Sequence, residues 1–294
     1  MSLTTLFTAR AEPAAARPSP FAPPAMTRRP PAGQPHFAAL AARFTPIGLA
    51  EMSTVALQDR LDTKFVLSEG QLYDALAALV ADYRVLDIHG VRLNRYRTLY
   101  YDTADFALFR QHHDGRRNRY KVRARSYVDS RLSFLEVKRK LKRNRTVKER
   151  LPTAALLTYL TPEANAFLNT TLPFAPEALE PRLWDEYTRI TLVSRRDQER
   201  LTLDLSLGFA CHSDAAADER VIAWPGVAIA EVKQGAHNRN SLFIGRMRAM
   251  GIRPVKFSKY CAGVAMLHEG LRHNNFKPKL RLINKLIGEE CRES

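Results

Sequence analysis

The sequence feature that most constrains the fold is a row of basic residues at every second position. The odd-numbered positions carry Arg117, Arg119, Lys121, Arg123 and Arg125. Because successive side chains of a strand point to opposite faces, a strand here places these cations on one face, about 6.6–7 Å apart. Val122 and Ala124 lie between them and give the opposite face an apolar character. Like charges in such a row repel one another unless an anion lies beside them, so the pattern indicates an anion-binding face.

The same alternation recurs in several other segments. The charged or polar rows are Arg60, Asp62 and Lys64; Glu136, Lys138 and Lys140; Arg200, Thr202 and Asp204; and Glu231 and Lys233. A solvated outer face would explain any single strand, but the apolar alternate positions favour helices packed on the other side. Turning the charged faces inward closes a barrel around a cationic tunnel. We therefore predict an α+β fold, an antiparallel β-barrel tunnel with a charged lumen, flanked by helices.

The net charge is concentrated in one part of the chain. The 294 residues include 46 Lys and Arg against 30 Asp and Glu, which gives a formal charge of +16. Residues 92–150 alone hold 19 basic and 6 acidic side chains, or +13 of this total. We therefore expect an anionic partner. Arg and Lys bind phosphate oxygens and carboxylates bind hard cations, so the mixture fits a polyanion together with a divalent metal.

The sequence also excludes several classes of protein. No window approaches the roughly 18 apolar residues that a membrane helix needs, so no transmembrane segment is expected. Cys211, Cys261 and Cys291 form no CxxC pair. Neither a disulfide framework nor a cysteine zinc site is therefore indicated, which fits a cytoplasmic protein. P-loop and Rossmann phosphate sites are unsupported, since the chain contains neither G-x-x-x-x-G-K-[ST] nor G-x-G-x-x-G.

The chain divides into three parts. Residues 1–50 hold nine of the seventeen prolines, so we expect residues 1–55 to be a disordered leader rich in Pro and Ala. Residues 56–268 form the tunnel domain, with strands near 60–65, 93–102, 117–127, 132–140, 146–151, 185–195, 199–209 and 227–233. Helices are expected from Ser68 and over about 104–112, 153–169, 238–250 and 257–268. Residues 269–294 are a basic tail in which one face of a short helix holds Leu280, Ile283, Leu286 and Ile287.

Two groups of side chains have both a structural and a functional interpretation. His112 and His113 precede a Gly turn, and we expect a surface pair rather than a metal site. Tyr100, Tyr101 and Tyr120 either stack on adenine or pack in the core, and we expect core packing.

Two further segments admit a similar choice. Ser258 is expected to cap the helix that follows, while Lys259 points at the tunnel mouth. The basic run 138–145 is similar to a nucleic-acid patch. Strand alternation orders its charges and few aromatic residues lie among them, so no stable nucleic-acid partner is expected.

Nine short motifs occur in the order in which a known family has them. They are RLDTK at 60–64, LYYD at 99–102, RYKVRAR at 119–125, LEVK at 135–138, KER at 148–150, YTR at 187–189, RLTLD at 200–204, EVK at 231–233 and SKY at 258–260. Over about 56–265 the chain resembles the catalytic domain of vacuolar transporter chaperone (VTC) proteins. That domain is a polyphosphate polymerase of the triphosphate tunnel superfamily, whose CYTH-type triphosphatases and adenylyl cyclases begin with E-x-E-x-K. Arg60 resembles the R-x-E-x-K start of the polymerase branch, with Asp62 in place of the usual Glu.

The resemblance implies roles for individual residues. It implies that the phosphates of the nucleotide or of the growing chain contact Lys64, Arg123, Arg125, Lys138, Lys148, Arg189, Arg200 and Lys259. It also implies that Glu231 holds Mn²⁺ or Mg²⁺, and Glu136 is the second expected metal ligand. The further residues expected to bind substrate are Arg60, Arg119, Lys121, Arg150 and Lys233.

The resemblance implies a polyphosphate polymerase that transfers the γ-phosphate of ATP to a growing chain. Its partners would be ATP and inorganic polyphosphate. Two alternatives stay open: a tunnel-type triphosphatase that hydrolyses nucleotide or inorganic triphosphate, and a non-catalytic binder of polyphosphate or nucleic acid. The sequence does not distinguish a phosphate acceptor from water, because the difference lies in access at the tunnel exit.

Overall fold

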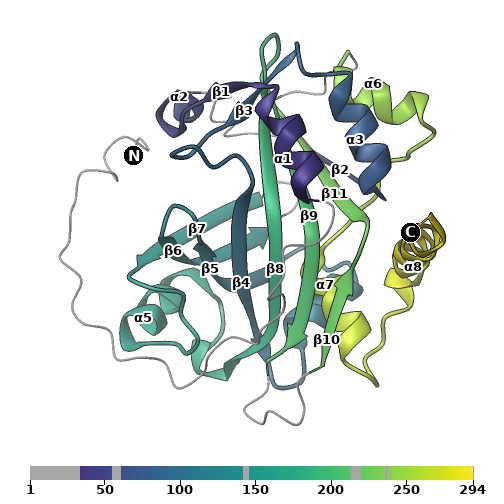
Figure 1. Ribbon diagram of the computed structural model, residues 1–294. Coiled ribbons are helices and arrows are strands. Elements are labelled where there is room, and N and C mark those ends of the chain that lie inside the picture. Colours follow the sequence, from purple (N-terminus) through teal and green to yellow (C-terminus); the bar gives the residue numbers. More distant parts are fainter. Residues whose placement is uncertain are drawn as a thin grey trace.

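The fold is one large, strongly curved sheet with helices packed around it (Figure 1). The computed structural model describes residues 34–54, 61–141, 146–212, 220–235, 238 and 240–293. Its strands are β1 Thr45–Ile47, β2 Leu61–Ser68, β3 Tyr83–Leu86, β4 Asn94–Thr103, β5 Arg119–Tyr127, β6 Leu132–Lys140, β7 Thr146–Thr153, β8 Leu179–Ser194, β9 Glu199–Cys211, β10 Val221–Trp224 and β11 Val227–Gln234. Its helices are α1 Gln34–Ala42, α2 Leu49–Thr54, α3 Glu69–Ala77, α4 Ala107–His113, α5 Pro162–Thr171, α6 Leu242–Ala249, α7 Lys259–Leu267 and α8 Lys277–Glu293. The α+β prediction is confirmed.

The sheet is antiparallel along its main path. The strand order is β2-β11-β9-β8-β4-β5-β6-β7, with β10 on β9 and β3 on β8. Only β1, which pairs with β3, adds a parallel ladder among the described strands. The register aligns the charged rows across strands, since Glu231 lies opposite both Lys64 and Thr202. Arg123 likewise lies opposite Glu136, so the charged residues share the concave face.

The opposite face of the sheet is apolar and covered by helices, as the alternation predicts. Phe65 of β2 and Leu201 of β9 belong to a buried cluster with residues of α1, α3 and α6. Val122 of β5 and Leu135 of β6 pack in a second cluster with α5. Helix α3 starts where Ser68 forms a reciprocal capping box, the N-terminal signal expected there.

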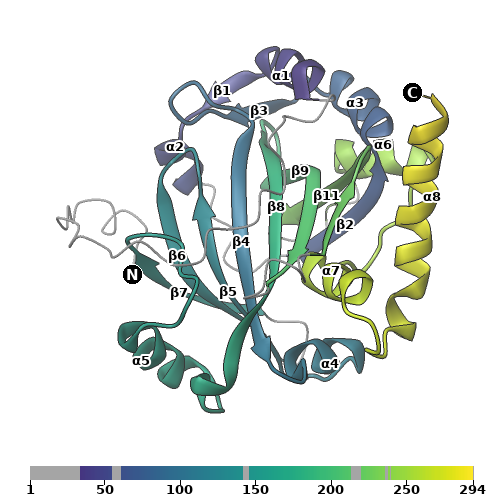
Figure 2. The ribbon, with the colours of Figure 1, turned by 60° about the horizontal axis from the view of Figure 1, so that its bottom comes forward.

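Helix α7 occupies a different position, inside the curve of the sheet. Gly263 of α7 comes so close to β8 and β9 that a Cβ atom there would lie 2.8 Å from the Leu183 and Phe209 side chains. Leu183 shares its face with Asp185 and Tyr187, because side chains alternate along β8. Helix α7 packs on β8 and β9, and Figure 2 shows it between the sheet and α8. One end of the charged lumen is therefore covered by this helix.

The tunnel prediction is confirmed, with one difference from a closed barrel: the sheet has an open seam. β2 and β7 lie at the two ends of the strand order, and no ladder joins them in the part of the chain that the structure describes. Lys64 of β2 faces Lys138 of β6 across the seam, close enough for each charge to affect the other. Like charges on both sides oppose strand pairing there. The lumen consequently opens sideways to a cavity.

Part of the segment predicted to be a disordered leader, residues 1–55, is folded. Residues 34–54 fold into α1, β1 and α2, and Phe37, Leu40 and Phe44 are at most 2% exposed. The proline count over residues 1–50 concealed these apolar residues, whose spacing of three and four is helical. Residues 1–33 and Arg60 lie outside the described residues.

The tail helix and most other elements agree with the sequence prediction. α8 buries Ile283 and Leu286, and Leu280 and Ile287 pack on the same cluster. Two predictions need adjustment: β8 begins six residues earlier than expected, and the helix expected over 153–169 is confined to Pro162–Thr171. None of the described helices combines the length and the apolar character required to cross a membrane.

The burial of α1 makes a prediction about stability. Leu40→Ala should lower the free energy of unfolding by about 2–5 kcal/mol, because the truncation leaves a cavity in a packed cluster. Leu132→Ala is the matched control, since Leu132 is 37% exposed. Denaturant unfolding of both variants checks this prediction, and an equal, small loss in the two would show that α1 does not belong to the core.

Candidate functional site

The lumen is organised around three carboxylates, each of which binds two cations. Glu231 binds Lys64 and Lys233, Glu136 binds Arg123 and Lys148, and Asp204 binds Arg189 and Lys259. Each group of three carries a net positive charge of one. The carboxylates therefore reduce the repulsion between the cations without abolishing the attraction for an anion.

The Glu231 group joins β2 and β11. Lys64 Nζ lies 2.8 Å from Glu231 Oε1 and Lys233 Nζ lies 2.5 Å from Oε2. Lys233 also donates a hydrogen bond of 2.6 Å to Thr202 of β9. Burial favours the neutral acid, but Lys233 and Lys64 outweigh burial and hold the pKa of Glu231 well below its ordinary value. Glu231 is therefore ionised at neutral pH.

The Glu136 group joins β5, β6 and β7. Arg123 Nε donates to Glu136 Oε2 at 2.8 Å, and Lys148 contacts the other oxygen. The Glu136 side chain is only 1% exposed. Burial raises its pKa, but Arg123 and Arg125 more than compensate and keep that pKa below the ordinary value. Of the two expected metal ligands, Glu136 is the more enclosed.

The Asp204 group joins β8, β9 and α7. Arg189 binds Asp204 with two hydrogen bonds of 2.5 and 2.8 Å, and Lys259 binds the same carboxylate. Lys259 Nζ also lies 3.3 Å from the centre of the Tyr187 ring, a cation–π contact. Lys259 therefore points into the lumen, which corrects the prediction that it points at the mouth. Ser258 caps α7 as predicted, because its Oγ accepts a hydrogen bond from the Cys261 amide.

Three lumen cations have no carboxylate partner among the described residues. Arg125 donates to Thr98 Oγ1 at 3.1 Å, and Lys121 donates to Ser258 Oγ at 2.7 Å. Burial lowers the pKa of Lys121 to about 7 and that of Lys138 to about 8. A lysine that is buried with too little negative charge nearby gains stability when an anion arrives. These residues are the ones best prepared to bind a phosphate.

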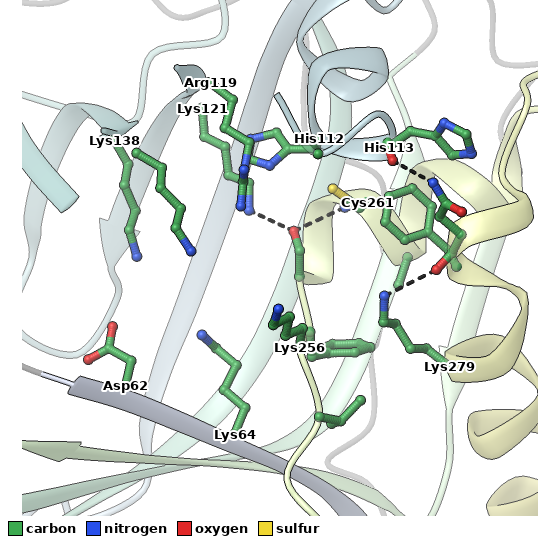
Figure 3. Close-up of a pocket in the computed structure, with 18 of the residues that line it drawn as sticks. Asp62, Lys64, His112, His113, Arg119, Lys121, Lys138, Lys256, Cys261 and Lys279 are labelled. Carbon is green, nitrogen blue, oxygen red and sulfur yellow. Dashed lines mark hydrogen bonds between the residues drawn. The ribbon is translucent and has the colours of Figure 1, made fainter. Parts of the chain in front are cut away.

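The seam leads to a cationic cavity of about 1070 Å³, which we call the mouth. Figure 3 shows Lys64 and Lys138 extending toward this space from opposite sides, with Lys121 above them. Asp62 is the one carboxylate among the described residues that line the mouth. The basic residues that line it are Lys64, Arg117, Arg119, Lys121, Lys138, Lys140, Lys256 and Lys279. The mouth therefore extends the cationic lumen toward α7 and α8.

The structure brings most of the expected site residues together, and the others lie at its margins. Arg119 lines the mouth. Arg150 is exposed on β7, where its guanidinium lies 4.8 Å from the Phe134 ring centre. Arg200 lies opposite Lys233 in the register. These positions leave the expected substrate-binding roles of the three arginines as predictions.

Three lumen residues were not assigned a role from the sequence: Asp185, Asp204 and Tyr187. Their positions in the sequence follow the same alternation as the charged rows. Asp204 continues the row of Arg200 and Thr202, and Asp185 and Tyr187 continue the row that ends at Arg189. Sequence analysis missed them because a carboxylate or a tyrosine in a basic row has no obvious role until its neighbours on other strands are known.

The histidine and tyrosine predictions have different outcomes. Tyr100, Tyr101 and Tyr120 are at most 5% exposed, which confirms core packing. The prediction that His112 and His113 form a surface pair is wrong, because His113 is 6% exposed and packs on the Phe276 ring. Helix α4 turns this residue toward the C-terminal segment. Among the described residues no group of three or more His, Cys, Asp or Glu gathers as a metal site.

Comparison with known families identifies the domain. Residues 59–268 match the VTC domain. The chain belongs to the VTC domain family. A comparison with curated protein sequences gives no match. The family match supports a triphosphate tunnel enzyme and covers all the strands that line the lumen.

A search of solved structures finds proteins that are similar to this chain at low sequence identity. One is a Bacillus halodurans protein described as a candidate adenylate cyclase, with 13% identity, a TM-score of 0.43, and coverage of 68% of this chain and 94% of that chain. Another is a proposed adenylyl cyclase from Hippeastrum with a dominant triphosphatase activity, with 13% identity, a TM-score of 0.43, and coverage of 73% and 100%. A protein of Pyrococcus horikoshii has 10% identity, a TM-score of 0.39, and coverage of 70% and 98%.

VTC domains generally use a divalent metal, and the lumen of this domain fits one. Each of the two glutamates binds two cations, but the Glu231 side chain is 16% exposed and that of Glu136 only 1%, so the ionised oxygens of Glu231 are the more accessible to a metal. Mg²⁺ is commonly bound by one or two carboxylates together with substrate phosphates and water. Glu231 would therefore hold the ion in company with a phosphate substrate rather than alone.

The Asp204 group makes a prediction about stability. Asp204→Asn should lower the free energy of unfolding by about 3–5 kcal/mol, because it leaves Arg189 and Lys259 buried without their shared carboxylate. Tripolyphosphate should restore a large part of the loss. Thermal melts with and without this anion measure both effects.

Asp105→Asn is the control for Asp204→Asn. Asp105 pairs with Arg110 at the surface, where its side chain is 59% exposed, so its loss should change stability little. Equal effects of the two substitutions would contradict the structural role of the buried group.

Proposed function

We propose that this VTC domain is an ATP-dependent polyphosphate polymerase. The observation that carries the proposal is the continuity of the cationic lumen with the cationic mouth. The lumen already offers three paired groups and the additional cations Arg125, Lys121 and Lys138 to a triphosphate. The mouth adds five basic residues beyond the lumen, namely Arg117, Arg119, Lys140, Lys256 and Lys279. A site for one triphosphate needs no such extension, whereas a growing polyanion does.

In this proposal the lumen residues position two anions for an in-line transfer. The triphosphate of ATP lies in the lumen, where the arginines bind its oxygens in pairs and the lysines add point charges. An oxygen of the terminal phosphate of the chain forms a bond to the γ-phosphorus, and the bond to the β–γ bridging oxygen breaks. ADP leaves, and the chain is longer by one phosphate. The residues contribute mainly position and positive charge, because phosphoryl transfer requires little covalent help.

Each carboxylate group has a defined part in this proposal. Glu231 would hold Mn²⁺ or Mg²⁺, which neutralises charge on phosphate oxygens when it is bound. Glu136 and Asp204 keep their arginines and lysines aligned along the lumen. Arg189 is held by two hydrogen bonds to Asp204, so its guanidinium does not have to be ordered when the substrate binds.

A phosphate acceptor is favoured over water by electrostatics. The chain end is itself an anion, and its approach to the γ-phosphoryl group is unfavourable unless cations surround both. Lys121, Lys138 and Lys64 lie where the mouth meets the lumen and supply such charge (Figure 3). Water is uncharged, so its approach depends less on these cations than that of a chain end does.

The test is incubation of the purified full chain with ATP and Mn²⁺, followed by gel staining for polyphosphate and a free-phosphate assay. We expect long chains with wild type and at least a hundredfold loss with Glu231→Gln, because the amide no longer offers an anionic ligand. Glu149→Gln is the matched control, since Glu149 is an exposed residue of β7 on the other face of the strand from Lys148 and Arg150.

Two outcomes would favour another function, and a third would overturn the metal assignment. Free phosphate without chains would favour the triphosphatase. Tight binding of polyphosphate without either product would favour a non-catalytic binder. Near-normal activity of Glu231→Gln would show that the assignment of the metal ligand is wrong.

A further inference from the structure

Asp185 is a buried lumen carboxylate without hydrogen-bond partners. Its side chain lies on β8, is 0% exposed, and neither oxygen accepts a hydrogen bond from any residue that the structure describes. Buried carboxylates normally accept several hydrogen bonds, because their desolvation is otherwise uncompensated. Asp185 therefore requires an explanation other than packing.

Asp102 shows how this fold satisfies a buried carboxylate that has a structural role. Asp102 is also 0% exposed, yet it accepts hydrogen bonds from the amides of Thr103, Leu108 and Phe109 and from the Tyr260 hydroxyl. It thereby fixes the start of α4 and the position of α7. Asp185 makes no comparable contact with a backbone amide.

Charged side chains from α7, β5 and β9 surround Asp185. Lys259 of α7 and Arg125 and Arg123 of β5 favour its ionised form, while Asp204 of β9 opposes it. Each of these cations has another hydrogen-bond partner. Lys259 binds Asp204, Arg123 binds Glu136, and Arg125 donates to Thr98. Tyr100 and Tyr187 complete the surroundings from β4 and β8.

The surroundings of Asp185 bring its pKa close to neutral pH. Burial raises the pKa of Asp185 to about 6, in spite of Lys259 and Arg125. A phosphate among the same cations would add negative charge beside the carboxylate and disfavour its ionised form further. The bound phosphate would also present an oxygen acceptor to Asp185, which has no hydrogen-bond partner among the described residues.

We propose that Asp185 binds phosphate as a neutral carboxylic acid, which donates a hydrogen bond from its Oδ–H to a non-bridging phosphate oxygen between Arg125 and Lys259. The proposal rests on the proposed function only in that it places phosphates in the lumen. Asp185 then acts as a recognition residue: its neutral form accepts a phosphate, and its ionised form repels one. Anion binding above about pH 6 therefore takes up one proton at this position.

The first experiment measures the binding of metal-free tripolyphosphate by calorimetry between pH 5.5 and 7.5, in buffers of different ionisation enthalpy. The full chain and Asp185→Asn are compared, because the amide keeps a hydrogen-bond donor but does not titrate. The wild-type affinity should fall up to about tenfold more per pH unit above pH 6 than that of the variant, and wild type should take up more protons. Titration of the ligand itself and of the lumen lysines is common to both proteins. Asp105→Asn should behave like wild type.

The second experiment needs no variant and so does not depend on how Asp185→Asn folds. Infrared difference spectra of wild type should show a protonated carboxyl band appearing when tripolyphosphate is added at pH 7. Equal pH slopes and equal proton uptake in the calorimetry, or no protonated carboxyl band, would overturn the role of Asp185. A complete absence of tripolyphosphate binding to wild type would instead overturn the proposed function together with this inference.

Discussion

The structure depends on the repulsion between like charges in a confined lumen and on the three carboxylates that limit it. Glu231, Glu136 and Asp204 each bring together two cations from different strands or, for Lys259, from a helix. Without them, the aligned arginines and lysines would destabilise the curved sheet. The pairing leaves an excess of positive charge, so the lumen retains an attraction for a polyanion. Stability and substrate affinity therefore arise from the same contacts.

The helices serve this arrangement in two ways. Those on the outside bury the apolar alternate residues, which lets the strands that line the lumen direct their charged residues inward. α7 lies inside, supplies Lys259 to Asp204, and covers Asp185 at one end of the lumen. The seam between β2 and β7 leaves the other side open to the mouth. The lumen thus has an end enclosed by α7 and a wide cationic approach.

The sequence predicted the faces of the strands well, because alternation is a local property with a period of two. Lys121, Arg123 and Arg125 lie on the lumen side as expected. The partners of these residues could not be predicted from the sequence. They depend on strand register and on contacts between residues far apart in the chain, such as Asp204 and Lys259. The open seam and the inner position of α7 depend on tertiary packing in the same way. The folded segment 34–54 was not predicted, because the proline-rich composition of residues 1–50 outweighed its three apolar residues Phe37, Leu40 and Phe44, which are buried.

The most direct test of this account is a crystal structure with Mn²⁺ and tripolyphosphate bound, in which anomalous scattering locates the metal. The account predicts phosphates along the lumen between Arg125, Lys138 and Lys259, with Mn²⁺ beside Glu231 and the three carboxylate groups still in place. Phosphates confined to the outer surface, or a metal bound away from Glu231 while the lumen stays without phosphate, would contradict it.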